Sequence, residues 1–320
     1  MNYELKKGVV LTPDDFIGVD WLAKFKEIGL NTLGLHSGGG PGHNVLEHLG
    51  DCASEEFHNK VKAAGIDYEY ELHAPHDLLP RDVFNTHPEF FIQPMGPKKE
   101  RVTTGNWCGA TKAALDFIAA NGAALGMKLN PSTHRHFFWG EDLNDGWCHC
   151  DKCAPYSPSD QNLKTANAIA DKLAETDPEA SVGCIAYHQT IDPPELIRPR
   201  KNVFLEFAPI HRCYEHAIDD PNCAINRQQW KTLLGLLEVF NADTAHILEY
   251  WLDSSKFSGW KKPAKKPECR VEIVQKDIEA YYRLGIRSFT TFAVYMDGVY
   301  FDTHGDQELR DYAAILNTLH

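Results

Sequence analysis

The segment VEIVQKDIEAYYRLGIRSFTTFAV, residues 271–294, carries one complete helix-to-strand unit. From Val271 to Leu284 the apolar residues recur as on one face of a helix, and Gly285 is typical of the position just past a helix C-terminus. From Ser288 to Val294 the chain is rich in β-branched and aromatic residues, which favours a buried strand. The segment therefore predicts a helix that packs onto the strand following it.

The same alternation extends back along the whole chain. Earlier apolar runs of strand character occupy residues 8–11, 32–35, 67–72, 136–139, 182–187, 202–207 and 246–251. Helical patterns occupy residues 21–28, 54–64, 110–125, 162–175 and 228–240, and a last one covers 307–319. Alternation of this kind implies a parallel sheet. Eight units that fill the chain favour an α/β fold of the closed (β/α)8 TIM-barrel type over a doubly wound open sheet.

The barrel prediction is specific at the level of single residues. One residue of each run is expected on a strand: Val9, Leu33, Tyr70, Phe138, Ile185, Leu205, Leu248 and Phe292. The 320 residues suit one barrel of ~250 residues with additions. We therefore expect a single domain, 1–320, with a long insertion at about 77–105 and a cysteine-rich loop at 144–160.

Charge and hydropathy exclude several classes of partner. There are 32 Lys and Arg against 45 Asp and Glu, a net charge of −13, which argues against nucleic acid and anionic membrane surfaces. No apolar run approaches the ~18 residues of a membrane span. Residues 1–7 contain no apolar signal core. The expected location is cytoplasmic, or secreted or periplasmic if a signal peptide has been removed, and the oligomeric state is open.

The ends of the predicted strands carry the candidate substrate-binding residues. Active sites of such barrels lie at the carboxyl ends of the strands. Carboxylates, histidines and aromatic rings gather there, as in sugar sites, where rings stack on aromatic faces and hydroxyls bond to carboxylates and imidazoles. The candidates are His76, Trp139, Tyr187, His188, Tyr250, Trp251, Tyr295 and Asp297. The alternative for each is a structural role, with the aromatic residues in the barrel core.

The acidic cluster after the fourth predicted strand is the main catalytic candidate. In WGEDLNDG, residues 139–146, two nearby carboxyls can divide the acid and stabiliser roles of glycoside cleavage. A neighbouring carboxylate raises the pKa of one of them. Side chains alternate along a strand, so Glu141 and Asp142 face one lumen only if Gly140 bends the chain. Asp145 is a further candidate, and Glu249 is the rival acid. A polar loop and a strand-end ion pair are the respective alternatives.

Three cysteines close behind that cluster have metal-ligand spacing. Cys148, Cys150 and Cys153 form a C-x-C-x2-C pattern, which can wrap a tetrahedral Zn²⁺ together with a fourth ligand. The possible fourth ligands are His149, Cys213 and Cys223. A structural zinc is the hypothesis, with no cofactor for catalysis. A disulfide, or reduced thiols packing a loop, are the alternatives.

A set of short stretches runs from the third predicted strand to the eighth. The stretches are residues 87–91 (HPEFF), 144–153 (NDGWCHCDKC), 157–160 (SPSD), Asn167 with Ala170, 186–187, 193–194, 202–203, Cys223 with Asn226, and 249–250. As a set, they resemble the family filed as domain of unknown function 4838, which includes the family-163 glycoside hydrolases.

The resemblance implies a glycosidase-like barrel and an endo-β-N-acetylglucosaminidase acting on N-glycans. It also implies a retaining reaction in which the 2-acetamido oxygen of the substrate is the nucleophile. Glu141 would then be the acid/base, and Asp142 or Asp145 would orient the acetamido group. Two other functions stay open from the residues: a non-catalytic carbohydrate-binding barrel, and a metal-dependent sugar isomerase or hydrolase, which the 16 histidines suggest.

Overall fold

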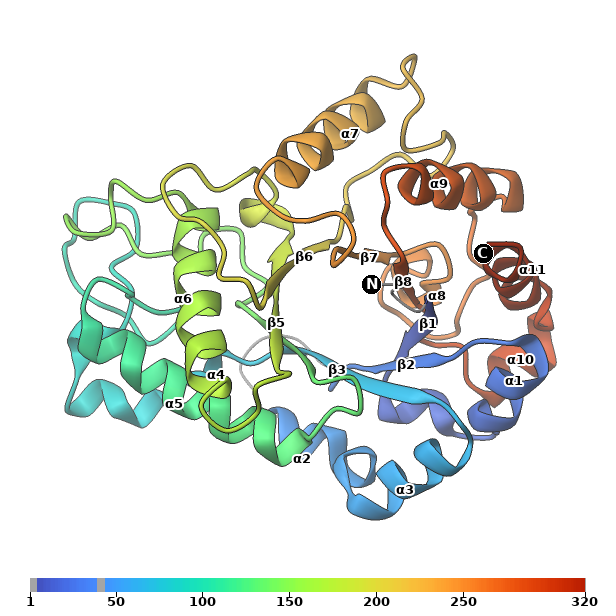
Figure 1. Cartoon of the computed structure of the whole chain (residues 1–320), viewed down its shortest axis with the longest axis horizontal. Coiled ribbons are helices and arrows are strands. Elements are labelled where there is room, and N and C mark those ends of the chain that lie inside the picture. The colour runs from blue at the N-terminus through green and yellow to red at the C-terminus, as the bar shows by residue number, and fades with distance from the viewer. Residues whose placement is uncertain (1–4, 39–43, 320) are drawn as a thin grey trace.

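The computed structural model describes residues 5–38 and 44–319 and contains a closed parallel barrel (Figure 1). Its strands follow one another in chain order, and β8 pairs with β1 to close the ring. The strands are β1 Lys6–Leu11, β2 Thr32–Leu35, β3 Asp67–His73, β4 Arg135–Trp139, β5 Ser181–Ala186, β6 Val203–Phe207, β7 His246–Glu249 and β8 Ser288–Phe292. All eight residues expected on strands lie on them, so the barrel prediction is confirmed.

Helices surround the barrel on all sides of the view in Figure 1. They are α1 Trp21–Ile28, α2 Val45–Leu49, α3 Glu55–Ala63, α4 Pro75–Leu78, α5 Lys112–Leu129, α6 Pro158–Leu173, α7 Ala224–Leu237, α8 Ser254–Phe257, α9 Val271–Arg283, α10 Gly298–His304 and α11 Gln307–Asn317. Short 3-10 turns are η1 Pro13–Phe16, η2 Gly50–Ala53, η3 Arg81–Asn85, η4 Pro88–Phe90 and η5 His188–Thr190. The insertion at 77–105 therefore begins with the end of α4, holds the two turns η3 and η4, and otherwise runs as loop.

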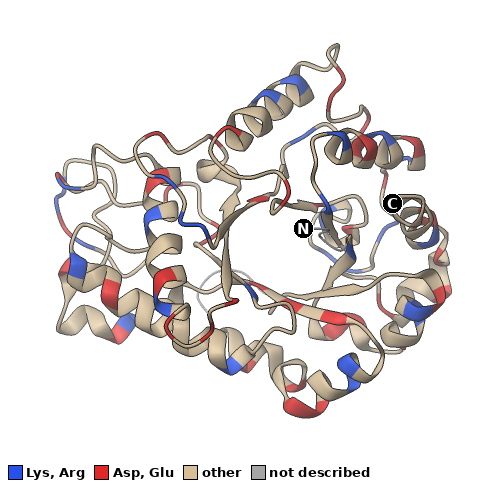
Figure 2. Ribbon diagram, in the orientation of Figure 1, with Lys and Arg blue, Asp and Glu red and all other residues tan. Residues whose placement is uncertain are grey.

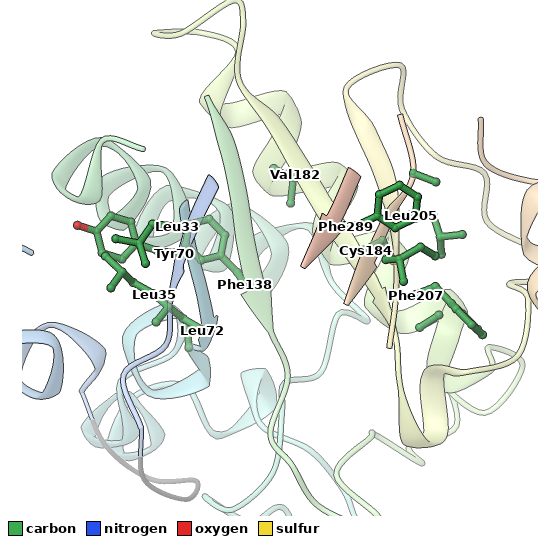
Figure 3. Close-up of a cluster of buried hydrophobic side chains, with 14 of the residues drawn as sticks. Leu33, Leu35, Tyr70, Leu72, Phe138, Val182, Cys184, Leu205, Phe207 and Phe289 are labelled. Carbon is green, nitrogen blue, oxygen red and sulfur yellow. The ribbon is translucent and has the colours of Figure 1, made fainter. Parts of the chain in front are cut away.

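Side chains of each strand alternate between the lumen and the helix layer. Figure 3 shows the outer set on several strands, including Leu33, Phe138 and Leu205, which belong to the large core beneath the helices. The neighbouring positions Phe137 and Leu248 belong to a separate cluster inside the barrel. Because of this alternation, only every second residue at a strand end points toward the lumen and the mouth of the barrel.

The lumen also contains buried titratable groups beside that apolar cluster. Glu69 and Glu71 lie on β3, whose ribbon carries red positions in Figure 2, and Glu206 lies on β6. Arg135 Nη1 lies 3.5 Å from Glu69 Oε1. The ligand atoms of Glu71, Glu206 and His246 lie within 4.8 Å of one another. The barrel floor is therefore acidic, with one arginine among the carboxyls.

Within residues 5–38 and 44–319, no helix is both long enough and apolar enough to cross a membrane. The first four residues, part of the stretch on which the expected location depends, lie outside the described chain.

Candidate active site

The backbone turns sharply where β4 ends, and this turn positions the acidic cluster. A Cβ at Gly140 would lie 2.6 Å from Asn106 Oδ1, so only glycine allows the insertion to approach so closely. Asn106 Oδ1 accepts a hydrogen bond from the Glu141 backbone N–H at 2.7 Å. The carbonyl of Gly140 lies 2.5 Å from His73 Nδ1. The residues after Trp139 thus leave strand geometry immediately, as required for Glu141 to reach the pocket.

Glu141 lies in an enclosed, partly neutralised environment. Its side chain is 3% exposed, and Oε1 accepts from Arg81 at 2.8 Å and lies 3.3 Å from His76 Nε2. Oε2 is buried without a hydrogen-bond partner among the described residues. Burial raises the pKa of this carboxyl, Arg81 opposes that rise, and the Asp142 carboxylate adds to it. One oxygen is therefore held in place while the other is free to carry a proton.

Asp142 points toward a different loop from its neighbour. Its Oδ1 accepts from the Tyr187 hydroxyl at 3.0 Å and lies 3.3 Å from His188 Nε2. His188 Nδ1 in turn lies 2.8 Å from His211 Nε2. Asp142 is 43% exposed at the side chain, so it is far more hydrated than Glu141. The two adjacent carboxyls thus occupy different environments, one dry and one wet.

A small pocket lies between these loops at the carboxyl ends of β4 and β5, and its space is about 330 Å³ when the open solvent at its mouth is included. Its lining includes His73, Trp139, Glu141, Trp147, Tyr187 and His188. Among the described residues that line it, Glu141 is the sole carboxyl. Trp139 forms part of the floor, where its indole N–H donates to Glu206 at 2.7 Å. The pocket therefore combines one buried acid with aromatic and imidazole surface.

Asp145 lies further along the same loop and does not line the pocket. Its Oδ1 lies 3.0 Å from His149 Nε2, and both side chains are partly exposed. This contact occupies the imidazole that was considered as a zinc ligand.

Glu249 faces away from the lumen, although it ends β7. It follows Leu248, which belongs to the lumen cluster, and so shares the outward face with Ile247. There it is fully buried and accepts from Arg212 at 2.9 Å and from the Tyr281 hydroxyl at 2.7 Å. The structure therefore does not bring this rival acid to the pocket and places it in an ion-pair network beneath α9.

Trp251 and Asp277 belong to the same buried network. The Trp251 indole N–H donates to Asp277 Oδ2 at 3.0 Å, and Arg212 reaches the same oxygen at 2.6 Å. Burial raises the pKa of Asp277 to about 6, while Arg212 opposes that rise. The structure thus places Trp251 under the helix layer, away from the pocket.

The other predicted substrate-binding residues lie around the mouth of the barrel but outside the pocket lining. Tyr250 packs in the lumen against Phe292, with ring centroids 5.3 Å apart. Tyr295 has Lys262 5.3 Å from its ring centroid. Asp297 caps α10 and pairs with Lys262 at 2.5 Å. Of the eight predicted binding residues, Trp139, Tyr187 and His188 line the pocket and His76 contacts its acid.

The three predicted metal-ligating cysteines converge, together with a fourth that the sequence reasoning did not select. The sulfur atoms of Cys108, Cys148, Cys150 and Cys153 lie within 4.8 Å of one another. The suggested fourth ligands Cys213 and Cys223 instead converge with His216 in a second group. Cys108 was missed because about 40 residues separate it from the other three, and spacing predicts only local ligand sets.

Arg81 and Asn106, which contact Glu141, were missed for the same reason. Both belong to or directly follow the long insertion, where the sequence carries no periodicity. The signal available was indirect: a long ordered loop next to an active-site strand is usually functional.

Eight parallel strands in a closed ring, with helices between them and an acid in a pocket at their carboxyl ends, define the class of (β/α)8 barrels with glycosidase-like architecture. Within that class, the chain belongs to the family described as domain of unknown function (DUF4838), whose model matches residues 51–315. The resemblance to the family of unknown function, inferred from the sequence, is thereby confirmed. No curated protein matches the chain.

Several solved structures are similar over nearly the whole chain. A chitinase from Rhizomucor miehei has a TM-score of 0.54 at 10% identity, covering 98% of this chain and all of that one. A GH18 chitinase from Pseudoalteromonas aurantia has a TM-score of 0.50 at 9% identity, covering 98% and 100%. The GH36 alpha-galactosidase AgaA from Geobacillus stearothermophilus has a TM-score of 0.51 at 9% identity, covering 98% and 42%. At such identities the similarity concerns the fold alone.

Proposed function

We propose that this protein is a glycoside hydrolase in which Glu141 protonates the leaving oxygen. The observation that carries the proposal is the Glu141 carboxyl itself. It is buried at the mouth of the barrel, lines the pocket, and has one oxygen held by Arg81 and the other without a partner among the described residues.

This arrangement suits a general acid. A glycosidic oxygen is a poor leaving group unless it receives a proton as the bond breaks, and a carboxyl held protonated by its surroundings supplies one. Burial favours the protonated form of Glu141. Arg81 fixes the orientation of the group and stabilises the carboxylate left after proton transfer.

The composition of the pocket favours a substrate that supplies its own nucleophile. A retaining enzyme that uses two carboxyls needs them ~5–5.5 Å apart across the scissile bond. Among the described residues the pocket lining contains one carboxyl, so the 2-acetamido oxygen of an N-acetylhexosamine is the proposed nucleophile. Asp142 is then the orienting group, acting through the Tyr187 hydroxyl that it binds.

These considerations favour glycans that contain N-acetylhexosamine, cleaved with retention, in the manner of an endo-β-N-acetylglucosaminidase. Tyr187 is partly exposed and would offer an aromatic face to a sugar ring, with the nearly buried Trp139 and Trp147 behind it in the lining, and His73 and His188 would supply hydrogen-bonding groups. Two of the solved structures with this fold are chitinases, which is compatible with that substrate class.

The test is a screen of aryl 2-acetamido-2-deoxy-β-glycosides and free N-glycans with the wild-type protein and Glu141→Gln. The substitution keeps the shape and removes the proton, so turnover of N-glycans should fall roughly 10²-fold or more. The loss should be smaller for an activated aryl leaving group, which needs less protonation.

Glu249→Gln is the matched control, because Glu249 is a buried carboxyl at the end of a strand but faces the helix layer. The turnover of the Glu249→Gln variant, measured per folded molecule, should equal that of the wild type. Glycan binding without turnover in the wild type would instead favour the carbohydrate-binding barrel. Full turnover by Glu141→Gln would remove Glu141 from the catalytic role.

A further inference from the structure

The four clustered thiols have the dimensions of a single-metal site. Cys108 Sγ lies 3.7 Å from Cys150 Sγ and 3.7 Å from Cys153 Sγ. A tetrahedron of sulfur atoms around zinc, with bonds of ~2.3 Å, has edges of about 3.8 Å. All four cysteines are buried and none forms a disulfide. Two of the sulfur–sulfur distances therefore match the edge of such a tetrahedron, and all four sulfur atoms lie within 4.8 Å of one another.

A backbone N–H donor and a positive charge lie next to the cluster. The Gln93 backbone N–H donates to Cys148 Sγ at 3.4 Å. The Arg101 guanidinium lies within hydrogen-bonding reach of the Cys108 and Cys150 sulfur atoms. A zinc ion with four thiolates has a net charge of −2, and Arg101 places a compensating positive charge beside it.

We propose that Cys108, Cys148, Cys150 and Cys153 bind one Zn²⁺ ion and that this ion clamps the long insertion to the loop that carries Glu141. Four thiolates in tetrahedral array are a donor set typical of structural zinc, which leaves no position open for substrate. The assignment of the metal does not depend on the proposed glycosidase activity, whereas its effect on turnover does.

The clamp joins two segments distant in sequence. Cys108 follows the insertion, and the other three cysteines lie in the loop between β4 and α6. Backbone bonds run between the same segments: Asn106 N–H donates to Gly146 at 2.9 Å, and His149 N–H donates to Gln93 at 2.8 Å. A bound zinc ion would therefore cross-link two segments that backbone hydrogen bonds already hold side by side.

The clamped segments are those that hold the acid. Asn106, two residues before Cys108, accepts from the Glu141 N–H, and Gly105 accepts from Arg81 at 2.8 Å. Arg81 in turn binds the Glu141 carboxylate. Loss of the metal should therefore loosen the backbone and the charged partner of Glu141 together.

The first experiment measures metal content by plasma mass spectrometry on the purified wild-type chain, with X-ray absorption at the zinc edge. One zinc per chain with four sulfur neighbours at ~2.3 Å is expected. Cys108→Ser and Cys153→Ser should lose most of it. Cys213→Ser, from the second group, is the matched control and should retain it.

Several results would overturn the zinc assignment. These are a wild-type chain that neither retains zinc nor takes up Co²⁺ with a tetrahedral thiolate spectrum, iron in place of zinc, or zinc lost from Cys213→Ser but kept by Cys108→Ser. The wild-type measurements decide the matter even if the cysteine variants fail to fold.

The second experiment tests the clamp by hydrogen exchange on wild-type protein before and after zinc removal by a chelator. Amides of residues 140–149 and 102–108 should exchange at least tenfold faster in the metal-free protein, while α9 stays unchanged. Unchanged exchange in the two loops would refute the clamp. Because exchange does not depend on turnover, a failure of the glycosidase proposal would leave this result intact.

Discussion

Arg81 binds only one carboxylate oxygen of Glu141. The guanidinium lies 2.8 Å from Oε1, while Oε2 is buried without a hydrogen-bond partner among the described residues. In this geometry the charge of Arg81 sets how firmly Glu141 holds its proton.

Arg81→Met should move the alkaline limb of the rate profile to higher pH. The Arg81 charge holds the pKa of Glu141 down against burial, so its removal lets that pKa rise. The acid then stays protonated to higher pH. Arg81→Lys keeps the charge and should move the limb less. Initial rates across pH on an unactivated glycan check this, and a shift to lower pH would contradict it.

Asp142→Asn should slow the cleavage of 2-acetamido substrates more than that of 2-hydroxy analogues. Asp142 accepts the hydrogen bond of Tyr187, and a hydrogen bond to a charged group contributes ~1.5 kcal/mol or more, about tenfold in rate. Asp145→Asn is the control, because Asp145 contacts His149 outside the pocket. Paired kinetics on matched aryl glycosides check this, and equal losses on both substrates would argue against an orienting role.

Glu249→Gln should destabilise the fold. Glu249 and Arg212 are fully buried, and removal of one partner of such a pair costs about 3 kcal/mol or more. Glu27→Gln, which removes a partner of Arg310 at the surface, should cost less than about 1 kcal/mol. Urea unfolding of both variants measures the difference. A stability close to that of the wild type for Glu249→Gln would mean that the network is dispensable.

His136 should make the stability of the fold sensitive to mild acid. It is packed beneath α5, where a Cβ at Gly126 would lie 2.8 Å from its Nδ1, and burial lowers its pKa to about 4. The unfolded imidazole takes up its proton near pH 6.5. The buried neutral imidazole of His136 therefore adds up to about 3 kcal/mol to the free energy of unfolding above pH 6.5, and this stabilisation is lost as the pH falls toward 4.

His136→Phe preserves a ring against Phe138, so it isolates the titration. Its unfolding free energy should fall less between pH 7 and pH 4 than that of the wild type. Parallel pH curves for the two proteins would show that His136 is not the titrating group.

The barrel was predictable because strands and helices differ in local pattern, and Val9 or Leu248 can be placed on strands from their neighbours alone. The orientation of Glu249 was not predictable. In a parallel barrel both faces of a strand are apolar, so Ile247 and Leu248 look alike and the sequence does not show which faces the lumen.

The candidate site was predictable where it follows a strand directly. Glu141, Tyr187 and His188 could be located in this way, since strand ends meet at one face of the barrel. Arg81, Asn106 and Cys108 could not. They reach the site through the path of the insertion, which is determined by long-range contacts such as the backbone bond between Asn106 and Gly146.

The acidic floor of the barrel makes folding a proton-uptake reaction. Burial raises the pKa of Glu206 to about 8, against the Trp139 hydrogen bond and Arg135, and burial beside Glu206 and Glu69 raises that of Glu71 well above its usual range. When the pKa of a carboxyl is higher in the folded than in the unfolded state, its protonation stabilises the fold. This stabilisation is complete below the unfolded pKa of ~4.5 and is lost as the pH rises through about 8, the pKa of Glu206 in the folded protein. At neutral pH, unfolding must then release protons into the buffer. The calorimetric unfolding enthalpy should consequently differ between phosphate and Tris by the heat with which each buffer takes them up.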